Sequence, residues 1–300
     1  MKALKSFWII ISLCAAACGA EAPPQEVLFG ARRFIEYQPG TLPLILAAPH
    51  GGREKPADLP DRTQGVVDID ANTQELARAV VAAVHEATGG RPHLIVCHLH
   101  RSKLDANRDL PEAAQGNALA SQAWREHHSF IERACRKAVK DHGVAFLIDL
   151  HGHGHPDPRV ELGYLFNASE LEEDEQALNS PAFVQKSSLR WLVEKRGIPH
   201  IDLLRGPFSL GALLEHEGFP ATPSPGKPVP GTPFFRGGYT IFRHCKAEAG
   251  VTGLQIEANR ARLRDTPANR QRFAQALAAS MKTYFAKNLG ITLGAEPASK

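Results

Sequence analysis

Residues 145–153, with the sequence AFLIDLHGH, join an apolar run to a group of metal-binding side chains. The apolar part, residues 145–150, predicts a buried strand. Because side chains alternate along a strand, Asp149, His151 and His153 would lie on one face at its end. Three polar side chains on one face are costly to bury unless they bind something, although a solvent-exposed strand end is the simpler alternative. His151 lies nearest the strand and is the expected metal ligand, whereas His153 is expected in the following loop. Asp149 is expected to point in parallel with His151 rather than to orient it.

The rest of the chain alternates apolar runs with helical patterns. Further strands are expected at residues 44–48, 93–99 and 253–257. Amphipathic helices are expected at residues 73–87, 118–142, 187–195 and 270–287, the first of them capped by the polar residues 70–73. Residues 219–233 contain six prolines in fifteen positions and predict a rigid surface loop. This alternation predicts an α/β fold with a mixed central sheet and helices on both faces.

Composition restricts the class of protein. The chain has 300 residues, of which 43% are hydrophobic and 22% charged, and a formal net charge of +3. These values are typical of a protein that buries a substantial core, and they exclude wholesale disorder. Lys and Arg are scattered among acidic residues, so no nucleic-acid partner is expected. No boundary appears within residues 25–290, which we expect to form one domain, followed by a frayed tail at residues 291–300.

The N-terminus has the pattern of a secretory signal. Two lysines precede the apolar run Phe7–Cys18, whose twelve residues are too short to span a membrane. This pattern predicts a signal peptide at residues 1–20 and an exported protein, periplasmic or secreted. Cys18 follows three alanines, which leaves a lipid on Cys18 open as the one expected membrane attachment. Cleavage would leave an odd number of cysteines, so no disulfide framework is expected: Cys97, Cys135 and Cys245.

A second coordinating group follows the strand at residues 44–48. His50 comes just after this strand, and the two glycines after it would let a ligand approach the backbone closely, so His50 is a candidate metal ligand. The same triplet could serve as the oxyanion loop of a serine hydrolase. Such an enzyme needs a Gly-x-Ser-x-Gly motif, and the nearest match, around Ser209, has Pro207 at the first glycine position. Serine chemistry is therefore not expected.

Two further segments carry polar side chains after apolar runs. Arg101–Asp109 contains Asn107 beside Arg108, a pair whose forked donors suit a carboxylate. Without other context this segment would be a charged surface loop. Glu257 ends an apolar strand, where a lone acid usually forms a salt bridge. Near a metal, however, such an acid can take a proton from an attacking water and act as a general base.

The order of these segments resembles the zinc carboxypeptidase-like superfold and, within it, the N-formylglutamate amidohydrolase family. The resemblance extends over about residues 45–265 and depends on motifs that occur in order. They are Pro49-His50-Gly51-Gly52, Asp70 leading into Glu75-Leu76, Arg101 through Arg108, Asp149-Leu150-His151, Phe235-Arg236-Gly237-Gly238-Tyr239 and Leu254-Gln255-Ile256-Glu257. The chain is also similar to poly-γ-glutamate hydrolases, in which a His-Gly-Gly loop is followed by an acid shortly before a Thr-x-Glu-Leu-Ala helix. One departure is Gly51, where the family has serine.

The resemblance implies one zinc ion held by His50, Asp70 and His151. Asp70 matches the position before the helix in both families. Glu54, in a His-x-x-x-Glu pattern, and Asp68, two residues before Asp70, remain alternatives for the carboxylate ligand.

The resemblance also implies roles for residues around the metal. Glu257 would be the general base, and Arg101 would stabilise the oxyanion. Asn107 and Arg108 would bind the α-carboxylate of the substrate, and Tyr239 would close over the substrate or simply pack. A second acidic group on the substrate would need another cation, for which three are available: Arg236, Arg243 and Arg260.

The implied activity is hydrolysis of an amide bond beside a free carboxylate, in N-formylglutamate, a related N-acyl amino acid or a short acidic peptide. Export argues against N-formylglutamate itself, because that compound belongs to cytoplasmic histidine breakdown. A γ-glutamyl or peptidoglycan-peptide hydrolase, or a carboxypeptidase, on the same scaffold is an alternative. Another metallohydrolase, such as an esterase or deacetylase, is a further one. A non-catalytic exported protein that binds carboxylated ligands is the alternative from a different class.

Overall fold

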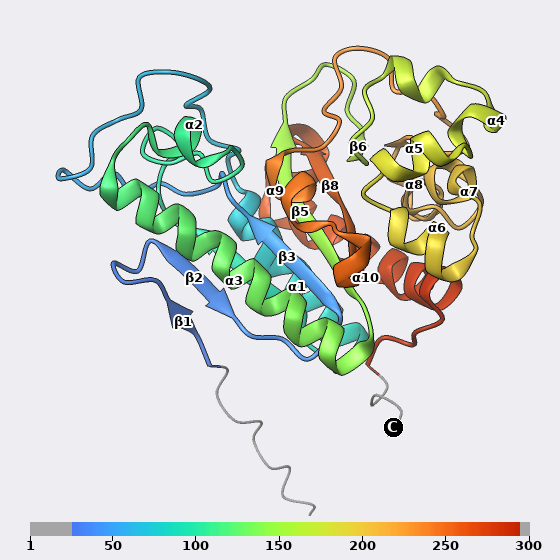
Figure 1. The fold of residues 1–300 in the computed structure, drawn as a ribbon, viewed down its shortest axis with the longest axis horizontal. Coiled ribbons are helices and arrows are strands. Elements are labelled where there is room, and N and C mark those ends of the chain that lie inside the picture. The colour runs from blue at the N-terminus through green and yellow to red at the C-terminus, as the bar shows by residue number, and fades with distance from the viewer. Residues whose placement is uncertain (1–25, 295–300) are drawn as a thin grey trace, which may run out of the picture.

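An eight-stranded mixed sheet runs through the described part of the chain, residues 26–294 of the computed structural model (Figure 1). The order across the sheet is β1-β2-β4-β3-β5-β8-β6-β7. The strands are β1 Leu28–Phe29, β2 Ile35–Gln38, β3 Leu44–Ala48, β4 His93–Cys97, β5 Ala145–His153, β6 Val160–Gly163, β7 Ala221–Thr222 and β8 Val251–Asn259. The predicted signal peptide, residues 1–20, lies outside the described residues.

The four central strands are parallel. β3 pairs with β4 on one side and with β5 on the other, and β5 pairs with β8, all in the parallel sense. Because these strands run the same way, their carboxyl ends meet at one edge of the sheet. Antiparallel strands flank them, β2 on β4 and β6 on β8, which makes the sheet mixed.

The described residues also form ten α-helices and four short 3-10 or π-helical turns. The α-helices are α1 Thr73–Thr88, α2 Leu110–Ala114, α3 Ala118–His142, α4 Glu175–Leu178, α5 Pro181–Lys186, α6 Arg190–Arg196, α7 His200–Arg205, α8 Leu210–His216, α9 Tyr239–His244 and α10 Pro267–Tyr284. The turns are η1 Ser169–Glu172, η2 Ala247–Ala249, η3 Arg260–Arg264 and η4 Phe285–Leu289. The short helices α4 to α8 lie together at the right of Figure 1.

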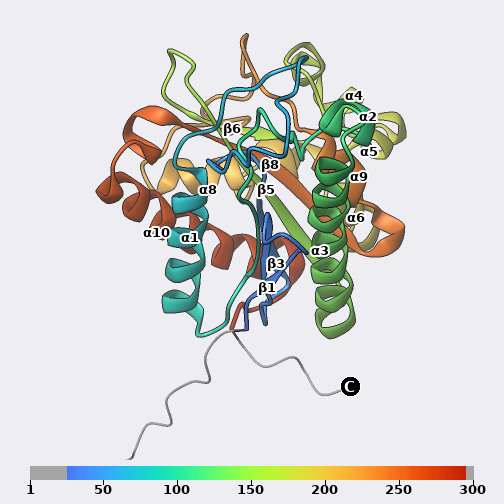
Figure 2. The same ribbon diagram turned by 90° about the vertical axis from the view of Figure 1, so that its left-hand side faces the viewer.

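Helices cover both faces of the sheet, which confirms the predicted fold class (Figure 2). α1 and α10 pack side by side on one face, and α3 lies on the other. The side chains of β3 alternate between two apolar cores: Leu44 and Leu46 join the core under α1, whereas Ile45 and Ala47 join the core under α3. Cys97 is buried in the second core, as expected, and the three described cysteines are free thiols.

The two long helices next to the site begin differently. The Asn117 side chain accepts a hydrogen bond from the Ala120 N–H at 3.0 Å and caps α3. Asn72, the residue before α1, has a positive φ of 67° and makes no side-chain cap, so the predicted capping by residues 70–73 is wrong. The physical reason is that the Asn72 side chain is used elsewhere: its Oδ1 accepts from Arg53 Nη2 at 3.2 Å, and its Nδ2 donates to the Arg264 carbonyl at 3.0 Å.

Several predicted boundaries differ from those observed. β5 continues to His153, because its pairing with β8 extends to the His153 and Asn259 positions. His153 is therefore a buried strand residue, and its prediction as a loop residue was wrong. β4 ends at Cys97, α6 begins at Arg190, and α10 begins and ends three residues earlier than predicted, at Pro267 and Tyr284.

Two segments that were expected at the surface are partly buried. Residues 219–233 include β7, which pairs with β6, so the start of this segment is buried and is not a surface loop. The chain end also packs further than predicted: Leu293 is 5% exposed in the core, and Ile291 packs against it. Fraying from residue 291 is therefore contradicted for residues 291–294, and residues 295–300 lie outside the described part.

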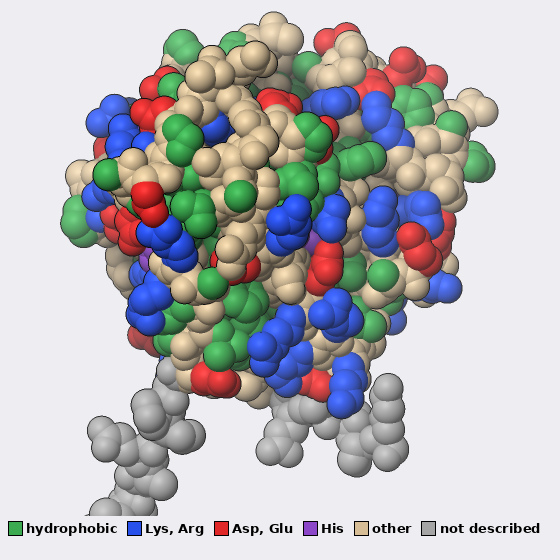
Figure 3. Space-filling model, turned by 60° about the vertical axis from the view of Figure 1, so that its left-hand side comes forward, with side chains coloured by type: hydrophobic (Ala, Val, Ile, Leu, Met, Phe, Trp, Pro, Cys, Tyr) green, Lys and Arg blue, Asp and Glu red, His purple; other side chains and the backbone are tan. Residues whose placement is uncertain are grey.

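The surface carries mixed charges. Figure 3 shows Lys and Arg side chains interspersed with Asp and Glu on one face of the molecule. On α3, for example, Arg136 pairs with Glu132 at 3.9 Å and Lys137 with Asp141 at 2.6 Å. Within residues 26–294, no helix combines the length and the apolar character needed to cross a membrane.

Candidate functional site

The predicted site residues come together where the carboxyl ends of the central strands meet. His50 lies two residues after β3, His151 lies in β5, and Glu257 lies in β8. Asp70 precedes α1 on a segment that is tied to the end of β3, because the Asp70 N–H donates to the His50 carbonyl at 3.0 Å. The parallel sheet thus brings residues far apart in the sequence to one place.

Two glycines let these segments approach closely. A Cβ on Gly51 would lie 2.6 Å from the Thr73 hydroxyl oxygen at the start of α1. A Cβ on Gly52 would lie 2.2 Å from the Leu99 carbonyl oxygen after β4. A serine at position 51, the residue of the family that the sequence resembles, would therefore require α1 to move.

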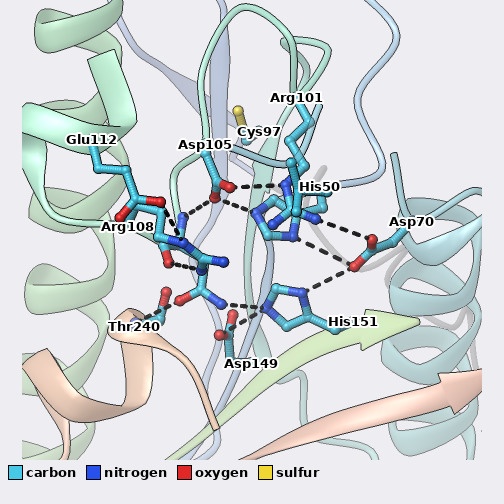
Figure 4. Close-up of polar contacts among 12 residues, drawn as sticks. His50, Asp70, Cys97, Arg101, Asp105, Arg108, Glu112, Asp149, His151 and Thr240 are labelled. Carbon is cyan, nitrogen blue, oxygen red and sulfur yellow. Dashed lines mark hydrogen bonds and ion pairs between the residues drawn. The ribbon is translucent and has the colours of Figure 1, made fainter. Parts of the chain in front are cut away.

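His50, Asp70 and His151 place three metal-binding groups around one point (Figure 4). The Nδ1 of His151 lies 3.0 Å from Asp70 Oδ2, and the Nδ1 of His50 lies 3.5 Å from the same oxygen. His50 Nδ1 is buried and has no hydrogen-bond partner among the described residues. Because an unpaired buried nitrogen is unfavourable, this atom marks where a metal would bind. Two imidazole nitrogens and one carboxylate oxygen are a donor set typical of catalytic zinc.

A buried carboxylate holds each imidazole from behind. His50 Nε2 donates to Asp105 Oδ1 at 2.6 Å, and His151 Nε2 donates to Asp149 Oδ2 at 2.9 Å. Such contacts orient metal-ligating histidines and leave the other ring nitrogen for the metal. Asp149 therefore does orient His151, and the expectation that the two side chains point in parallel was wrong. Asp105 had no role assigned from the sequence, although it belongs to the Asp-x-Asn-Arg motif.

The charges around the cluster favour a bound cation. Burial alone would lower the pKa of His151, but Asp149 and Asp70 raise it well above the usual range. Burial would raise the pKa of Asp70, but the hydrogen bond with His151 and the nearby His50 imidazole hold it well below the usual range. The site thus holds positive charge strongly, and a metal would compete with protons for the imidazole nitrogens.

Geometry separates the three carboxylates considered as the third ligand. Asp70 is buried against both histidines and belongs to the cluster. Glu54 and Asp68 are exposed, and the Glu54 backbone bridges to Leu99 instead. Asp70 is therefore the carboxylate that could complete this site.

Glu257 projects beside His151 from the next strand. The two residues are register partners in parallel strands, so their side chains lie on the same side of the sheet. Glu257 is buried, and Gln255 Nε2 donates to its Oε1 at 2.8 Å. Burial raises the pKa of Glu257 to about 8; His151 opposes the shift and Asp70 adds to it. A carboxyl group that titrates near neutral pH is suited to accept and return a proton.

Arg101 lies next to the metal-binding cluster. Its Nε donates to Asp105 Oδ2 at 2.9 Å, and its Nη1 lies 3.7 Å from Asp70 Oδ1. The side chain is buried, so its position is determined by these contacts. A fixed guanidinium beside a metal ligand can stabilise negative charge that develops on a substrate oxygen.

Asn107 links the metal-binding cluster to the start of α9. Its Oδ1 accepts a hydrogen bond from the Thr240 N–H at 2.7 Å, and its Nδ2 lies 3.0 Å from His151 Nε2. Because Nδ2 is a donor and His151 Nε2 already donates to Asp149, this contact does not use up the hydrogens of Nδ2. The role of Asn107 in carboxylate binding stays a prediction.

Comparisons with known proteins bear on the fold. No protein-family model matches the sequence, and no curated protein matches it. Among solved structures, the chain is similar to N-formylglutamate amidohydrolase from Ralstonia eutropha JMP134, with a TM-score of 0.50 and 13% identity over 84% of this chain and 96% of that chain. The chain therefore shares the fold of this structure.

Two weaker similarities were also found. One is to a gene product from Agrobacterium tumefaciens, with a TM-score of 0.47 and 12% identity over 81% of this chain and 90% of that chain. The other is to a protein from Shewanella denitrificans OS217 that was proposed to be a metallopeptidase, with a TM-score of 0.37 and 14% identity over 89% of this chain and 84% of that chain.

A cavity of about 800 Å³ begins at Asn107 and extends along α9. Arg108 and Tyr239, both expected to bind substrate, line this cavity. Arg108 also pairs with Glu112 at 3.0 Å, which holds its guanidinium at the rim. Tyr239 packs against the Trp124 ring with 6.1 Å between ring centroids, so it both packs and faces the cavity.

Only one of the three arginines considered for a second acidic group lines this cavity. Arg236 lines it and forms no ion pair with another residue of the described chain. Arg243 pairs with Glu132 at 3.2 Å, and Arg260 is not part of the lining. A second acidic group in the cavity would therefore meet Arg236.

Two other groups of residues do not form a second site. His153, His155 and Glu161 lie close together, but His153 already uses Nε2 to contact the Arg159 carbonyl and Nδ1 to accept the His155 N–H. Glu161 is paired with Arg159 at 3.0 Å. This cluster therefore fits a structural ion-pair network. Ser209 is buried and caps α8, so its hydroxyl is used within the fold.

Proposed function

We propose that this protein is a zinc-dependent amidohydrolase that cleaves an amide bond beside a free carboxylate. The observation that carries the proposal is the buried, unpaired Nδ1 of His50, which faces the same Asp70 oxygen as His151 Nδ1. The amidohydrolase fold and the carboxylates behind both imidazoles support it. A divalent metal bound in such a site polarises the scissile carbonyl and makes water more acidic.

The residues of the chain supply the proton transfers and the fixed charges. Glu257 accepts a proton from the attacking water and returns it to the departing amine, which is why a carboxyl group that titrates near neutral pH is useful at this position. Arg101 faces the carbonyl oxygen as it gains negative charge. Because both side chains are buried, neither has to reorganise as the reaction proceeds.

The cavity supports a carboxylated substrate of more than minimal size. Arg108 and Arg236 line it, and Arg236, which forms no ion pair within residues 26–294, offers forked donors that match a carboxylate. Its volume of about 800 Å³ lies in the upper part of the range for small-molecule sites. We therefore propose an N-acyl amino acid of the N-formylglutamate type, or a short acidic peptide, as the substrate.

The size of the cavity and the predicted signal peptide favour one second candidate. An exported enzyme with this site would act on γ-glutamyl peptides or peptidoglycan peptides, for which a cavity of about 800 Å³ leaves room. We propose export to the periplasm or beyond, with attachment through a lipid on Cys18 as the alternative to a free protein.

The test compares the purified mature protein with Glu257→Gln. The substrates are N-formyl-, N-acetyl- and γ-glutamyl-amino acids and muropeptides, each with and without chelator. We expect turnover in the wild type that is lost with chelator. Glu257→Gln is expected to retain metal, measured by elemental analysis, and to lower kcat by about 10²–10⁴-fold.

Glu54→Gln is the matched control, since Glu54 is exposed and lies away from the cluster. It should have wild-type turnover. A wild type that binds metal and these ligands but releases no amine would contradict catalysis and favour the non-catalytic binding protein. Hydrolysis of esters but not of amides would favour another metallohydrolase on the same fold.

A further inference from the structure

Arg264 is a buried arginine at the edge of the candidate site. It is 4% exposed and forms no ion pair with any residue between 26 and 294. Burying a guanidinium is costly unless its N–H groups are satisfied and opposite charge lies nearby. Such a residue therefore needs an explanation from its surroundings.

The guanidinium of Arg264 donates to backbone carbonyls of three separate elements. Its Nε donates to the Ala258 carbonyl in β8 at 3.0 Å, and its Nη2 donates to the His153 carbonyl at the end of β5 at 3.1 Å. Its Nη1 donates to the Ala71 carbonyl, just before α1. One planar group thus ties β5, β8 and the start of α1 together.

These carbonyls belong to the segments that carry the site. Asp70 directly precedes Ala71, and Glu257 directly precedes Ala258. His151 lies two residues before His153. The contacts of Arg264 therefore act on the spacing between the carboxylate ligand, an imidazole ligand and the general base.

The surrounding backbone is shaped to place this guanidinium. After β8 the chain turns back through Arg262, which has a positive φ of 69°, a conformation that non-glycine residues rarely adopt. The Asn72 amide donates to the Arg264 carbonyl at 3.0 Å. Opposite, Gly152 leaves room, because a Cβ there would lie 2.2 Å from Arg264 Nε and 2.5 Å from its Cζ.

We propose that Arg264 is a positioning residue of the metal site, which holds Asp70 at the correct distance from His151 and Glu257. This inference depends on the proposed function. The Asp70 carboxylate also acts electrostatically on the guanidinium and supplies the opposite charge that its burial requires. Arg264 touches neither side chain through a hydrogen bond, so it acts through the backbone.

The test measures the dissociation constant for Zn²⁺ by competition with a chelating dye, together with kcat and KM. In Arg264→Gln we expect a dissociation constant about 10–100-fold weaker and a lower kcat with little change in KM. Arg264→Lys retains the positive charge but lacks the planar guanidinium that reaches several carbonyls at once. Its affinity for Zn²⁺ should therefore lie between those of Arg264→Gln and the wild type. Arg136→Gln, at an exposed arginine of α3, is the control and should match the wild type.

A second variant covers the case in which Arg264→Gln does not fold. Gly152→Ala retains the arginine but pushes the guanidinium away from its carbonyls, so it should show the same weakening of Zn²⁺ binding. If folded Arg264→Gln or Gly152→Ala binds Zn²⁺ as tightly as the wild type, the positioning role is refuted while the proposed function stands. A wild type that does not bind Zn²⁺ would overturn both.

Discussion

Asp105→Asn tests whether the buried carboxylate behind His50 prepares the site for metal. Asp105 accepts hydrogen bonds from His50 Nε2 at 2.6 Å, from Arg101 Nε at 2.9 Å and from the Asn107 N–H at 3.1 Å. Asparagine has nearly the same shape, but one of its two polar groups is a donor. At least one of these three donors therefore loses its acceptor, and His50 loses the negative charge that fixes its orientation.

The expected magnitude follows from the type of contact. Removing a carboxylate that orients a metal-ligating histidine typically weakens metal binding by about 10–100-fold. This corresponds to about 1.4–2.7 kcal/mol in the free energy of metal binding. The metal-free protein should also lose about 2 kcal/mol of unfolding free energy, because hydrogen bonds to a charged group are among the stronger ones.

The assay is a Zn²⁺ competition titration of the metal-free variant at fixed pH, with urea unfolding measured in parallel. Asp109→Asn is the matched control, since Asp109 is exposed in the same loop and caps α2 through a hydrogen bond from the Glu112 N–H at 3.0 Å. Asparagine caps a helix as well as aspartate does, so this control should show no change. The reasoning is refuted if Asp105→Asn retains wild-type affinity for Zn²⁺.

Three further outcomes are expected. Chelation should lower the melting temperature of the wild type but not of His151→Ala, because a metal present at 100 times its dissociation constant adds about 2.7 kcal/mol to the free energy of unfolding. Equal shifts in the two proteins would argue against metal binding at His151. Asn117→Ala should lower the unfolding free energy by about 1 kcal/mol and Asn117→Asp by much less, measured by urea unfolding, since the side chain caps α3; equal losses would argue against the cap. Burial lowers the pKa of His93 to about 4, so the unfolded chain binds more protons between about pH 6.5 and 4. The free energy of unfolding should therefore fall as the pH drops through this window, by up to about 3 kcal/mol from this group, and the fall should be less steep in His93→Gln. Parallel stability-against-pH curves for the two proteins would contradict this role of His93.

The predicted fold came from local patterns that the tertiary structure did not override. The run at 145–150 and the helix at 118–142 appear with nearly the predicted bounds, because buried parallel strands are continuous apolar runs and amphipathic helices repeat every 3.6 residues. Errors occurred where long-range pairing decided the outcome. β5 gained His153 from its pairing with β8, and β7 formed in a proline-rich segment because it pairs with β6.

The sequence by itself determined which residue types are available at the strand ends, and therefore that His50, His151 and a carboxylate could share a metal. Local patterns did not rank Glu54, Asp68 and Asp70, because linear spacing says little about which side chain is buried; the family resemblance favoured Asp70. The tertiary structure adds the burial, by turning the chain so that Asp70 meets both imidazoles while the other two carboxylates stay exposed.

The supporting contacts depended still more on the three-dimensional arrangement. Nothing in the sequence distinguishes Asp105 or Arg264 from other aspartates and arginines. Only the structure shows that Asp105 contacts His50 and that Arg264 donates to three backbone carbonyls. Their roles arise because the parallel sheet brings distant segments within hydrogen-bond reach. Local residue patterns determine helices and strands, whereas the distances between metal ligands depend on packing across the whole domain.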